Sequence, residues 1–343
     1  MPAPLRLRLD GAALTDNWRT LAAMSGPAAC GAAVKADGYG LGADAVVRRL
    51  ATAGCRDFFV ATWAEAAALA PSGVSLAVLH GVRDEDLSAA LSGVARPVLN
   101  SAAQVARWKA AGGGACDVMV DTGMNRLGVS VEDVASGLLD GLAIDTLMSH
   151  LACADEDVAM NAAQHSAFTA LAGKTQAKRM SLANSAGIAL GTDYAFDLTR
   201  PGLALYGGVQ RPAFAGRIRQ VVTPEAQVLQ RRRVAAGGKV GYNATWTASA
   251  PTEVAILNLG YADGYWRGFS NKGIARAAGG SLPVIGRVSM DLTAIDVTAA
   301  PDLAEGDWVA IDYALPEASA ASGMSQYELL TGLGARYDRV WSN

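Results

Sequence analysis

The sequence predicts a two-domain protein in which an α/β domain built on a parallel sheet is followed by a mostly β domain. Its length of 343 residues is typical of two domains. As far as about residue 206, short runs that are apolar throughout alternate with helical patterns, and such runs suit strands buried on both faces of a parallel sheet. After about residue 209 the segments become short and β-rich, with glycine and proline between them.

The first strand is predicted at residues 5–9, where leucine alternates with arginine. Mostly apolar strands are then predicted at residues 28–34, 57–61, 75–79, 97–99, 115–120, 144–148 and 178–182. Helical spacing lies between them, most clearly at residues 43–53 and 63–69. Seven or eight such units indicate either a (β/α)8 barrel or a doubly wound sheet, and periodicity alone does not choose between them.

In the second half, strands are predicted at residues 221–229, 252–257, 281–288 and 292–297. The strand at residues 5–9 precedes the first helix of the α/β domain, so we expect it to join the β domain. The predicted organisation therefore assigns residues 1–10 to the β domain, residues 11–212 to the α/β domain and residues 213–343 to the β domain.

Composition argues against several classes of protein. The charged fraction is 18% and the net charge is −3, so nothing indicates a nucleic-acid or membrane surface. The four cysteines form no CxxC pair, which favours free thiols in a reducing compartment over disulfides or a zinc site. The N-terminus lacks an apolar signal-peptide core, and no apolar run approaches the roughly 18 residues of a membrane helix. We therefore expect a soluble cytoplasmic protein without a bound metal ion.

The most informative segment is VKADGYGLG at residues 34–42. A lysine directly after a buried strand, Lys35, either marks the point where the chain reaches the surface or lies at the carboxyl end of a barrel strand, where barrel active sites are built. Desolvation there lowers the pKa of a lysine, and the neutral amine then condenses with a carbonyl group. Gly38, Gly40 and Gly42 would leave room for a bulky ligand beside the backbone.

Two later segments are less specific. In ANSAG (183–187) a polar side chain either caps the next helix or helps to form an anion site with exposed N–H groups. The segment RPGLALYG (200–207) follows the last predicted barrel strand, where barrels frequently bind phosphate. His150, one of three histidines, is either a hydrogen-bonded core residue or part of a site.

Together these segments resemble the alanine racemase family. The matching motifs run in the family's order over almost the whole chain: VKADGYGLG (34–42), DTGMNRLG (121–128), SHLACAD (149–155), ANSAG (183–187), RPGLALYGG (200–208), VGYNATW (240–246), LGYADGY (259–265) and GRVSMDLT (286–293). The resemblance implies a (β/α)8 barrel that binds pyridoxal 5′-phosphate (PLP), followed by a β domain. It also implies interconversion of L- and D-alanine, supply of D-alanine for cell-wall peptidoglycan, and a homodimer with shared active sites.

The resemblance also implies a role for each matching residue. Lys35 would hold PLP covalently, and Arg200 would face its pyridine nitrogen. The phosphate would be contacted by Tyr39, Ser185, Gly202 and Leu203, with Asn184 beside them. Lys35 and Tyr242 would be the two bases, and His150 and Arg200 would form a chain from Tyr242 towards the cofactor. Arg126 would bind the substrate carboxylate, and the partner subunit would contribute Tyr242, Tyr261, Met290 and Asp291 to the pocket.

The chain departs from the family's pattern at three positions. Many relatives carry a carbamylated lysine where this chain has Met119, and a glycine where it has Asn125. We therefore expect Asn125, with an anion such as chloride, to orient Arg126. Ala335 stands where some relatives have a tyrosine, although Tyr337 lies two residues on; a smaller side chain there would make the pocket roomier and admit serine.

Three alternatives remain beside alanine racemase. A barrel decarboxylase of basic amino acids would place an acidic residue at the pyridine nitrogen, and Arg200 argues against it. A racemase of broader specificity, acting on serine and other amino acids, is closer. A non-catalytic PLP carrier made of the barrel alone would have no use for VGYNATW and GRVSMDLT.

Overall fold

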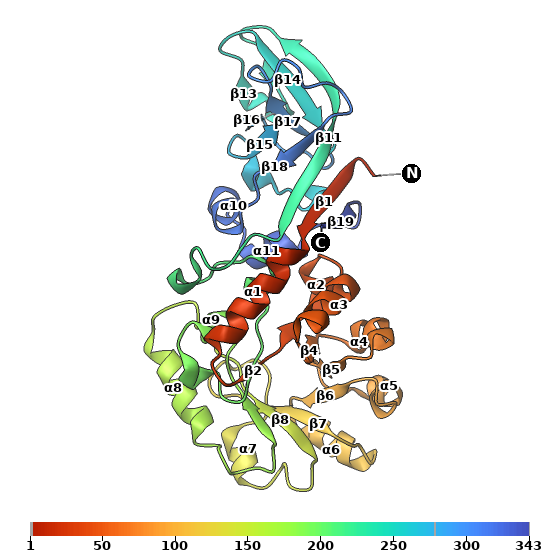
Figure 1. Ribbon diagram of the computed structural model, residues 1–343, viewed down its shortest axis with the longest axis vertical. Helices are drawn as coiled ribbons and strands as arrows, with labels where there is room; N and C mark the ends of the chain where they lie inside the picture. The colour runs from red at the N-terminus through yellow and green to blue at the C-terminus, as the bar shows by residue number, and fades with distance from the viewer. Residues whose placement is uncertain (1–2, 278, 343) are drawn as a thin grey trace. The chain divides into compact units, whose positions relative to one another are not determined.

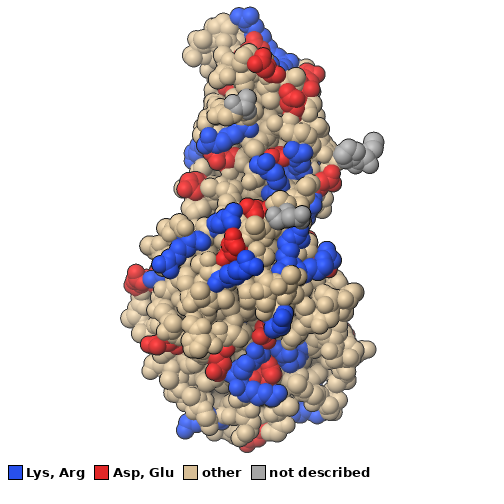
Figure 2. All heavy atoms as spheres, viewed as in Figure 1, with Lys and Arg blue, Asp and Glu red and all other residues tan. Residues whose placement is uncertain are grey.

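The computed structural model describes residues 3–277 and 279–342, and the chain divides into two compact units (Figure 1). The barrel unit contains residues 14–219, and the β unit contains the residues up to 13 together with those from 220 onward. In the described part of the chain, no helix is both long enough and apolar enough to span a lipid bilayer. Lysine and arginine are interspersed with acidic residues over the face seen in Figure 2.

The barrel unit is built on a parallel sheet with seven strands in sequence order. They are β3 (Ala32–Ala33), β4 (Asp57–Val60), β5 (Ser75–Val78), β6 (Arg96–Leu99), β7 (Cys116–Met119), β8 (Ile144–Met148) and β9 (Arg179–Ser181). Residues of β4, β7 and β8 are buried almost throughout, as expected for strands covered on both faces.

A further pair of strands closes this sheet into a barrel. The strand predicted at residues 28–34 is interrupted at Gly31, so that β2 (Ala29–Cys30) precedes β3 and pairs in parallel with β10 (Leu198–Thr199). On its other side β10 is joined to β9 through Arg200, whose N–H donates to the Ala183 carbonyl (2.8 Å). Of the two predicted folds, the barrel is confirmed and the doubly wound sheet is excluded.

The main helices surround these strands (Figure 1). They are α1 (Gly11–Met24), α3 (Ala43–Ala53), α4 (Trp63–Leu69), α5 (Leu87–Leu91), α6 (Ala102–Ala110), α7 (Val131–Ala135) and α8 (Ala159–Thr169). Short helical segments follow the strands at α2 (Lys35–Tyr39), α9 (Ser185–Ile188), η3 (Thr192–Tyr194), η4 (Leu203–Tyr206) and η5 (Pro212–Phe214). Several begin with capping side chains, such as Thr62 before α4 and Ser101 before α6.

The β unit contains an antiparallel ring of six strands. The ring is formed by β11 (Val222–Val234), β14 (Thr252–Leu257), β17 (Thr293–Asp296), β16 (Gly280–Ile285), β15 (Ile274–Ala277) and β18 (Trp308–Ile311). The 13-residue β11 also pairs with β1 (Leu5–Asp10), which in turn pairs with β19 (Asp338–Ser342). In β1, Leu5, Leu7 and Leu9 are buried, and the arginines between them contact Glu225, which explains the alternation in this strand.

The remaining elements of the β unit are short. They are β12 (Lys239–Val240), η6 (Tyr242–Ala244), β13 (Trp246–Thr247), η7 (Tyr261–Asp263), η8 (Arg267–Phe269), α10 (Leu315–Ser322) and α11 (Gln326–Thr331). All four cysteines of the chain are free thiols, and three of them are buried.

Candidate active site

Lys35 lies at the carboxyl end of the first barrel strand and begins a left-handed turn. The four residues that follow it, Ala36, Asp37, Gly38 and Tyr39, have φ angles between 53° and 62°. This conformation costs roughly 1–2 kcal/mol for each residue other than glycine. Strained backbone of this kind persists only where the surroundings hold it, and it is concentrated at functional sites.

Three hydrogen bonds hold the turn. The Asp37 carboxylate accepts from the Ala43 N–H (2.8 Å), the Glu65 carboxylate accepts from the Ala36 N–H (2.6 Å), and the Gly38 N–H donates to the Val34 carbonyl (2.8 Å). Gly38 therefore serves the turn itself, as well as leaving space beside the backbone. The consequence is a fixed path for the chain immediately after Lys35.

The environment of Lys35 favours a neutral amine. Burial lowers the pKa of Lys35, the positive charge of Arg126 lowers it further, and Glu65 opposes these effects. Among the described residues the amine makes no hydrogen bond or ion pair. A partly desolvated lysine of this kind is suited to nucleophilic chemistry.

Hydroxyl and backbone N–H groups gather beside this lysine. The Ser185 hydroxyl accepts hydrogen bonds from the Gly202 N–H (2.9 Å) and the Ala204 N–H (3.2 Å). The Tyr39 hydroxyl packs so closely on Gly202 that a Cβ at that position would lie 2.2 Å from its oxygen. Leu203 begins η4, so helix geometry leaves its N–H without a partner inside the helix. We call Tyr39, Ser185, Gly202 and Leu203 the anion cradle.

Two neighbouring contacts position the cradle. The Tyr39 ring stacks on Tyr206 with ring centroids 4.6 Å apart, and the Tyr206 hydroxyl donates to the Ala33 carbonyl (2.8 Å). Asn184 caps α9, because its side-chain oxygen accepts from the Gly187 N–H (2.8 Å). Asn184 therefore fulfils the capping alternative, and Ser185 beside it belongs to the cradle.

Arg200 is a buried cation with neutral partners. Only 7% of the residue is exposed, and its guanidinium donates to the Ser149 carbonyl (2.6 Å) and to the Ser181 hydroxyl. Burial lowers its pKa to about 10, while the negative charge of Asp117 acts in the opposite direction. Arg200 therefore remains protonated at neutral pH and has no carboxylate ion pair among the described residues.

His150 follows β8 and lies among the same cations. Burial lowers its pKa to about 3, and the charges of Arg200, Arg126 and Lys35 contribute to the shift. Its imidazole is therefore neutral at pH 7. The Arg200 guanidinium donates to the carbonyl of the preceding residue, Ser149, and not to the imidazole, so the expected link between Arg200 and His150 is electrostatic.

Arg126 is exposed on the loop after β7 and makes no hydrogen bond or ion pair within residues 3–277 and 279–342. The Asn125 side chain, whose backbone has φ 55°, donates to the Gly123 carbonyl (3.4 Å). The expected contact from Asn125 to Arg126 is thus not made. Met119, at the end of β7, is buried.

The second group of predicted residues lies in the β unit. Tyr242 begins η6 and is 69% exposed, and Met290 is 54% exposed. Tyr261 begins η7, with the Arg267 guanidinium 5.1 Å from the centre of its ring. Tyr242 and Met290 are among the most exposed large apolar side chains of the described chain.

Ala335 and Tyr337, the C-terminal positions at which the chain departs from the family's pattern, also lie in the β unit. Tyr337 is buried, and burial raises its pKa well above the usual value. Ala335 is exposed. Tyr337 therefore lies inside the β unit, whereas Ala335, two residues before it, is exposed.

Arg336 was not singled out by the sequence. Its guanidinium bonds to two carboxylates, from Nε to Asp263 (2.6 Å) and from Nη1 to Asp291 (2.8 Å). These partners are 73 and 45 residues away in the chain. No local pattern signals contacts at such separations.

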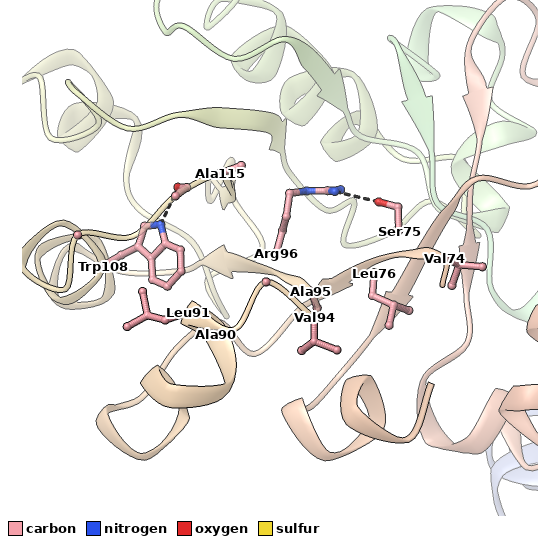
Figure 3. Close-up of a pocket in the computed structure, with 13 residues that line it drawn as sticks. Val74, Ser75, Leu76, Ala90, Leu91, Val94, Ala95, Arg96, Trp108 and Ala115 are labelled. Atoms are coloured by element: carbon pink, nitrogen blue, oxygen red, sulfur yellow. Dashed lines mark hydrogen bonds between the residues drawn. The ribbon is translucent and has the colours of Figure 1, made fainter. Parts of the chain in front are cut away.

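A cavity of about 360 Å³ lies at the amino ends of the barrel strands (Figure 3). Its lining comes from the starts of β5 and β6, the turn before β7 and the helices α5 and α6, and includes Ser75, Leu76, Leu91, Val94, Arg96 and Trp108. Arg96 points toward Ser75 and donates to its hydroxyl (2.9 Å), and the Trp108 indole donates to the Gly114 carbonyl (3.1 Å). Because both groups already have partners and barrel active sites lie at the carboxyl ends of the strands, the candidate site is the one around Lys35.

Comparison with known proteins identifies relatives over the whole chain. The family model "Alanine racemase, N-terminal domain" matches residues 9–210, and "Alanine racemase, C-terminal domain" matches residues 221–341. An alanine racemase of Acidiphilium cryptum is 43% identical, covering 97% of this chain and 98% of the relative. A catabolic alanine racemase of Agrobacterium fabrum is also 43% identical, covering 98% of this chain and 91% of the relative. The crystal structure of the Bartonella henselae alanine racemase with covalently bound pyridoxal phosphate is 35% identical, covers 99% of this chain and 100% of that one, and has a TM-score of 0.90.

Proposed function

The chain belongs to the alanine racemase family, and from this premise we propose that it interconverts L- and D-alanine with PLP bound through Lys35. The observation that carries the proposal is the anion cradle beside a partly desolvated lysine. Hydroxyl and backbone N–H donors suit a phosphate group, and the bare Cα of Gly202 keeps the space that the Tyr39 hydroxyl needs. The residues present therefore fit the cofactor.

When bound, PLP would draw electrons from the substrate's α-carbon and so acidify its proton. Arg200 would donate a hydrogen bond to the ring nitrogen, and because a guanidinium keeps its proton at neutral pH it would not transfer that proton to the ring. The Ser149 carbonyl and the Ser181 hydroxyl would hold Arg200 in place for this role.

Racemisation removes a proton from one face of the α-carbon and returns one to the other. Lys35, with its lowered pKa, would exchange a proton on one face, and Tyr242 would do so on the opposite face. An ordinary tyrosine has a pKa near 10, so it needs stabilisation as a base. His150, neutral at pH 7, would accept or donate a hydrogen bond with the Tyr242 hydroxyl, while Arg200 would act on the imidazole through its charge.

Arg126 would bind the substrate carboxylate. Its guanidinium has no partner of its own in the described chain, so both edges of the planar group are available for a bidentate contact. Tyr261, Met290 and Asp291 would enclose the other side of the substrate.

We further propose that the active enzyme is a homodimer in which Tyr242, Tyr261 and Met290 act on the Lys35 of the partner subunit. Support comes from the exposure of Tyr242 and Met290, since large side chains this exposed are frequently covered by a partner. A dilution series that yields monomers should abolish racemisation while the PLP absorbance persists. A fully active monomer would contradict the shared site.

The direct test uses the purified protein with PLP. Solvent deuterium should replace the α-proton of both L- and D-alanine. The same exchange is then measured with D- and L-serine. Tyr242→Phe should lose racemisation but keep the cofactor absorbance, and Tyr327→Phe, an exposed tyrosine of α11 in the same unit, serves as the matched control. No exchange with alanine would refute the proposal, and equal exchange with serine would favour the racemase of broader specificity.

A further inference from the structure

Three segments that are distant in the sequence converge in the β unit: residues 260–264, 289–292 and 332–336. The Tyr261 N–H donates to the Ser289 carbonyl and the Ala262 N–H donates to the Met290 carbonyl, both at 3.0 Å. A Cβ at residue 260 would lie 2.2 Å from the Met290 carbonyl oxygen, so only glycine permits this approach. Tyr261 and Met290 are therefore joined through their backbones.

One charged side chain ties these two segments to the third. The Arg336 guanidinium donates through Nε to Asp263 (2.6 Å) and through Nη1 to Asp291 (2.8 Å). Asp263 directly follows Tyr261 and Ala262, and Asp291 directly follows Met290. Each carboxylate is thus one or two residues from a side chain proposed to enclose the substrate.

Asp263 has a second role in the same loop. Only 1% of the residue is exposed, and its other carboxylate oxygen accepts from the Gly260 N–H (3.0 Å). A carboxylate this buried needs a counter-charge, and Arg336 is the cation that bonds to it. The charge of Arg336 therefore stabilises the loop that carries Tyr261.

We propose that Arg336 is a positioning residue of the substrate pocket, which fixes Tyr261 and Met290 relative to each other by bridging Asp263 and Asp291. The inference rests on the proposed function, because it assumes that these two side chains enclose the substrate. It assigns Arg336 an effect on substrate affinity and not on proton transfer, since its guanidinium is engaged with the two carboxylates.

Arginine is required by this geometry. Two carboxylates are bonded by different nitrogens of one planar group, whereas the ammonium of lysine is a point charge on a flexible stem. Lysine at this position would neutralise Asp263 but leave Asp291 unattached. Arg336→Lys therefore distinguishes the effect of the bridge between the two carboxylates from the effect of a positive charge beside Asp263.

The test compares Arg336→Met and Arg336→Lys with Arg276→Met. Arg276 is a matched control because it lies in the same unit, forms an ion pair with Asp312 (2.6 Å), and has a side-chain exposure of 52% against 49% for Arg336. We expect KM for L-alanine to rise roughly tenfold in Arg336→Met, as for the loss of one hydrogen bond to a charged group. The rise should be smaller in Arg336→Lys, kcat should change little, and Arg276→Met should change neither constant.

Hydrogen exchange gives a second measurement that is independent of catalysis. In Arg336→Met the amides of Tyr261 and Ala262 should exchange faster than in the parent protein, while those of β15 and β18 should not. If Arg336→Met matched Arg276→Met in both KM and exchange, or lowered kcat with KM unchanged, the positioning role would be overturned. A parent protein that did not racemise alanine would refute the proposed function, and the exchange measurement would still decide whether the bridge holds the loops.

Discussion

Replacing Asp117 by asparagine should stabilise the barrel unit at neutral pH. Asp117 belongs to an ion-pair cluster at the amino ends of the barrel strands, together with Asp57, Arg96, Asp145 and Arg179. Arg179 bonds to Asp57 and Asp145, and Arg96 lies 3.4 Å from Asp117 and 3.6 Å from Asp145. Lys178 also lies 3.7 Å from Asp145, so the cluster contains three carboxylates and three cations and has no excess charge.

Asp117 is the carboxylate with the poorest environment. Its side chain is fully buried and its Oδ2 has no hydrogen-bond partner among the described residues. Burial raises its pKa to about 6, although Arg96 acts against this shift. An exposed aspartate has a pKa of about 4, so the difference of about two units corresponds to about 3 kcal/mol.

The protonation of Asp117 determines how the stability of the barrel unit changes with pH. Between pH 4 and pH 6 the folded chain retains a proton on Asp117 that the unfolded chain has lost, so stability falls as pH rises through this window. Above about pH 6 the full penalty is present. Asparagine carries no charge at any pH, and its side-chain oxygen can still accept from the Thr146 N–H, which lies 3.0 Å from Asp117 Oδ1.

We therefore expect Asp117→Asn to raise the free energy of unfolding of the barrel unit by up to about 3 kcal/mol at pH 7.5 and by close to zero at pH 4. Denaturant-dependent hydrogen exchange of the β7 and β8 amides, at fixed protein concentration, measures this quantity for the barrel alone. Asp57→Asn is the matched control: it removes a carboxylate that bonds to Arg179 at 2.9 and 3.1 Å, so it should destabilise the unit. A difference in the free energy of unfolding between Asp117→Asn and the parent protein that did not depend on pH would refute the reasoning. A loss of stability in Asp117→Asn at pH 7.5 would also refute it.

Three further predictions concern the site. Gly202→Ala should weaken PLP binding and lower the free energy of unfolding by about 1–3 kcal/mol, because the new Cβ would lie 2.2 Å from the Tyr39 hydroxyl. PLP titration measures the affinity and thermal unfolding measures the stability; an unchanged PLP affinity would contradict the prediction. Arg200→Glu should raise transamination of alanine to pyruvate relative to racemisation, because a carboxylate favours protonation of the PLP ring nitrogen. An unchanged ratio of the two reactions would count against the assigned role of Arg200. Arg126→Met should raise the pKa of Lys35, since the Arg126 charge lowers it; labelling of the Lys35 amine across pH in the cofactor-free protein measures this, with Arg83→Met as the control.

The sequence was most informative where local pattern and tertiary packing agree. The strand predicted at residues 144–148 and the helices predicted at residues 43–53 and 63–69 have the bounds that the structure gives to β8, α3 and α4. All three are segments whose apolar spacing matches their burial. The strand at residues 28–34 was predicted as continuous. Its break at Gly31 was missed because it depends on a tertiary contact: a Cβ there would lie 2.8 Å from the Asp57 carbonyl oxygen.

Other features of the site are set by contacts that a linear sequence does not display. The left-handed turn after Lys35 includes Ala36 and Tyr39, which disfavour that conformation, and it is held partly by Glu65 from another element. The bridge made by Arg336 joins carboxylates far away in the chain. Family resemblance pointed to the residues around these features, and the backbone and ion-pair geometry that hold them come from the fold.

The distribution of charge around the site explains why it suits anionic ligands. Arg126 and Arg200 have no ion pair with a carboxylate in the described residues, whereas Arg336 has two such partners. Burial keeps His150 neutral, and the unpaired charges of Arg200 and Arg126 add to this effect. Burial also lowers the pKa of Lys35, and the charge of Arg126 lowers it further. A phosphate in the anion cradle and a carboxylate at Arg126 would supply the missing negative charge. Pairing Arg126 with a bound carboxylate would then weaken its effect on Lys35 and raise the proton affinity of that amine while substrate is present, which favours removal of the α-proton by the Lys35 amine.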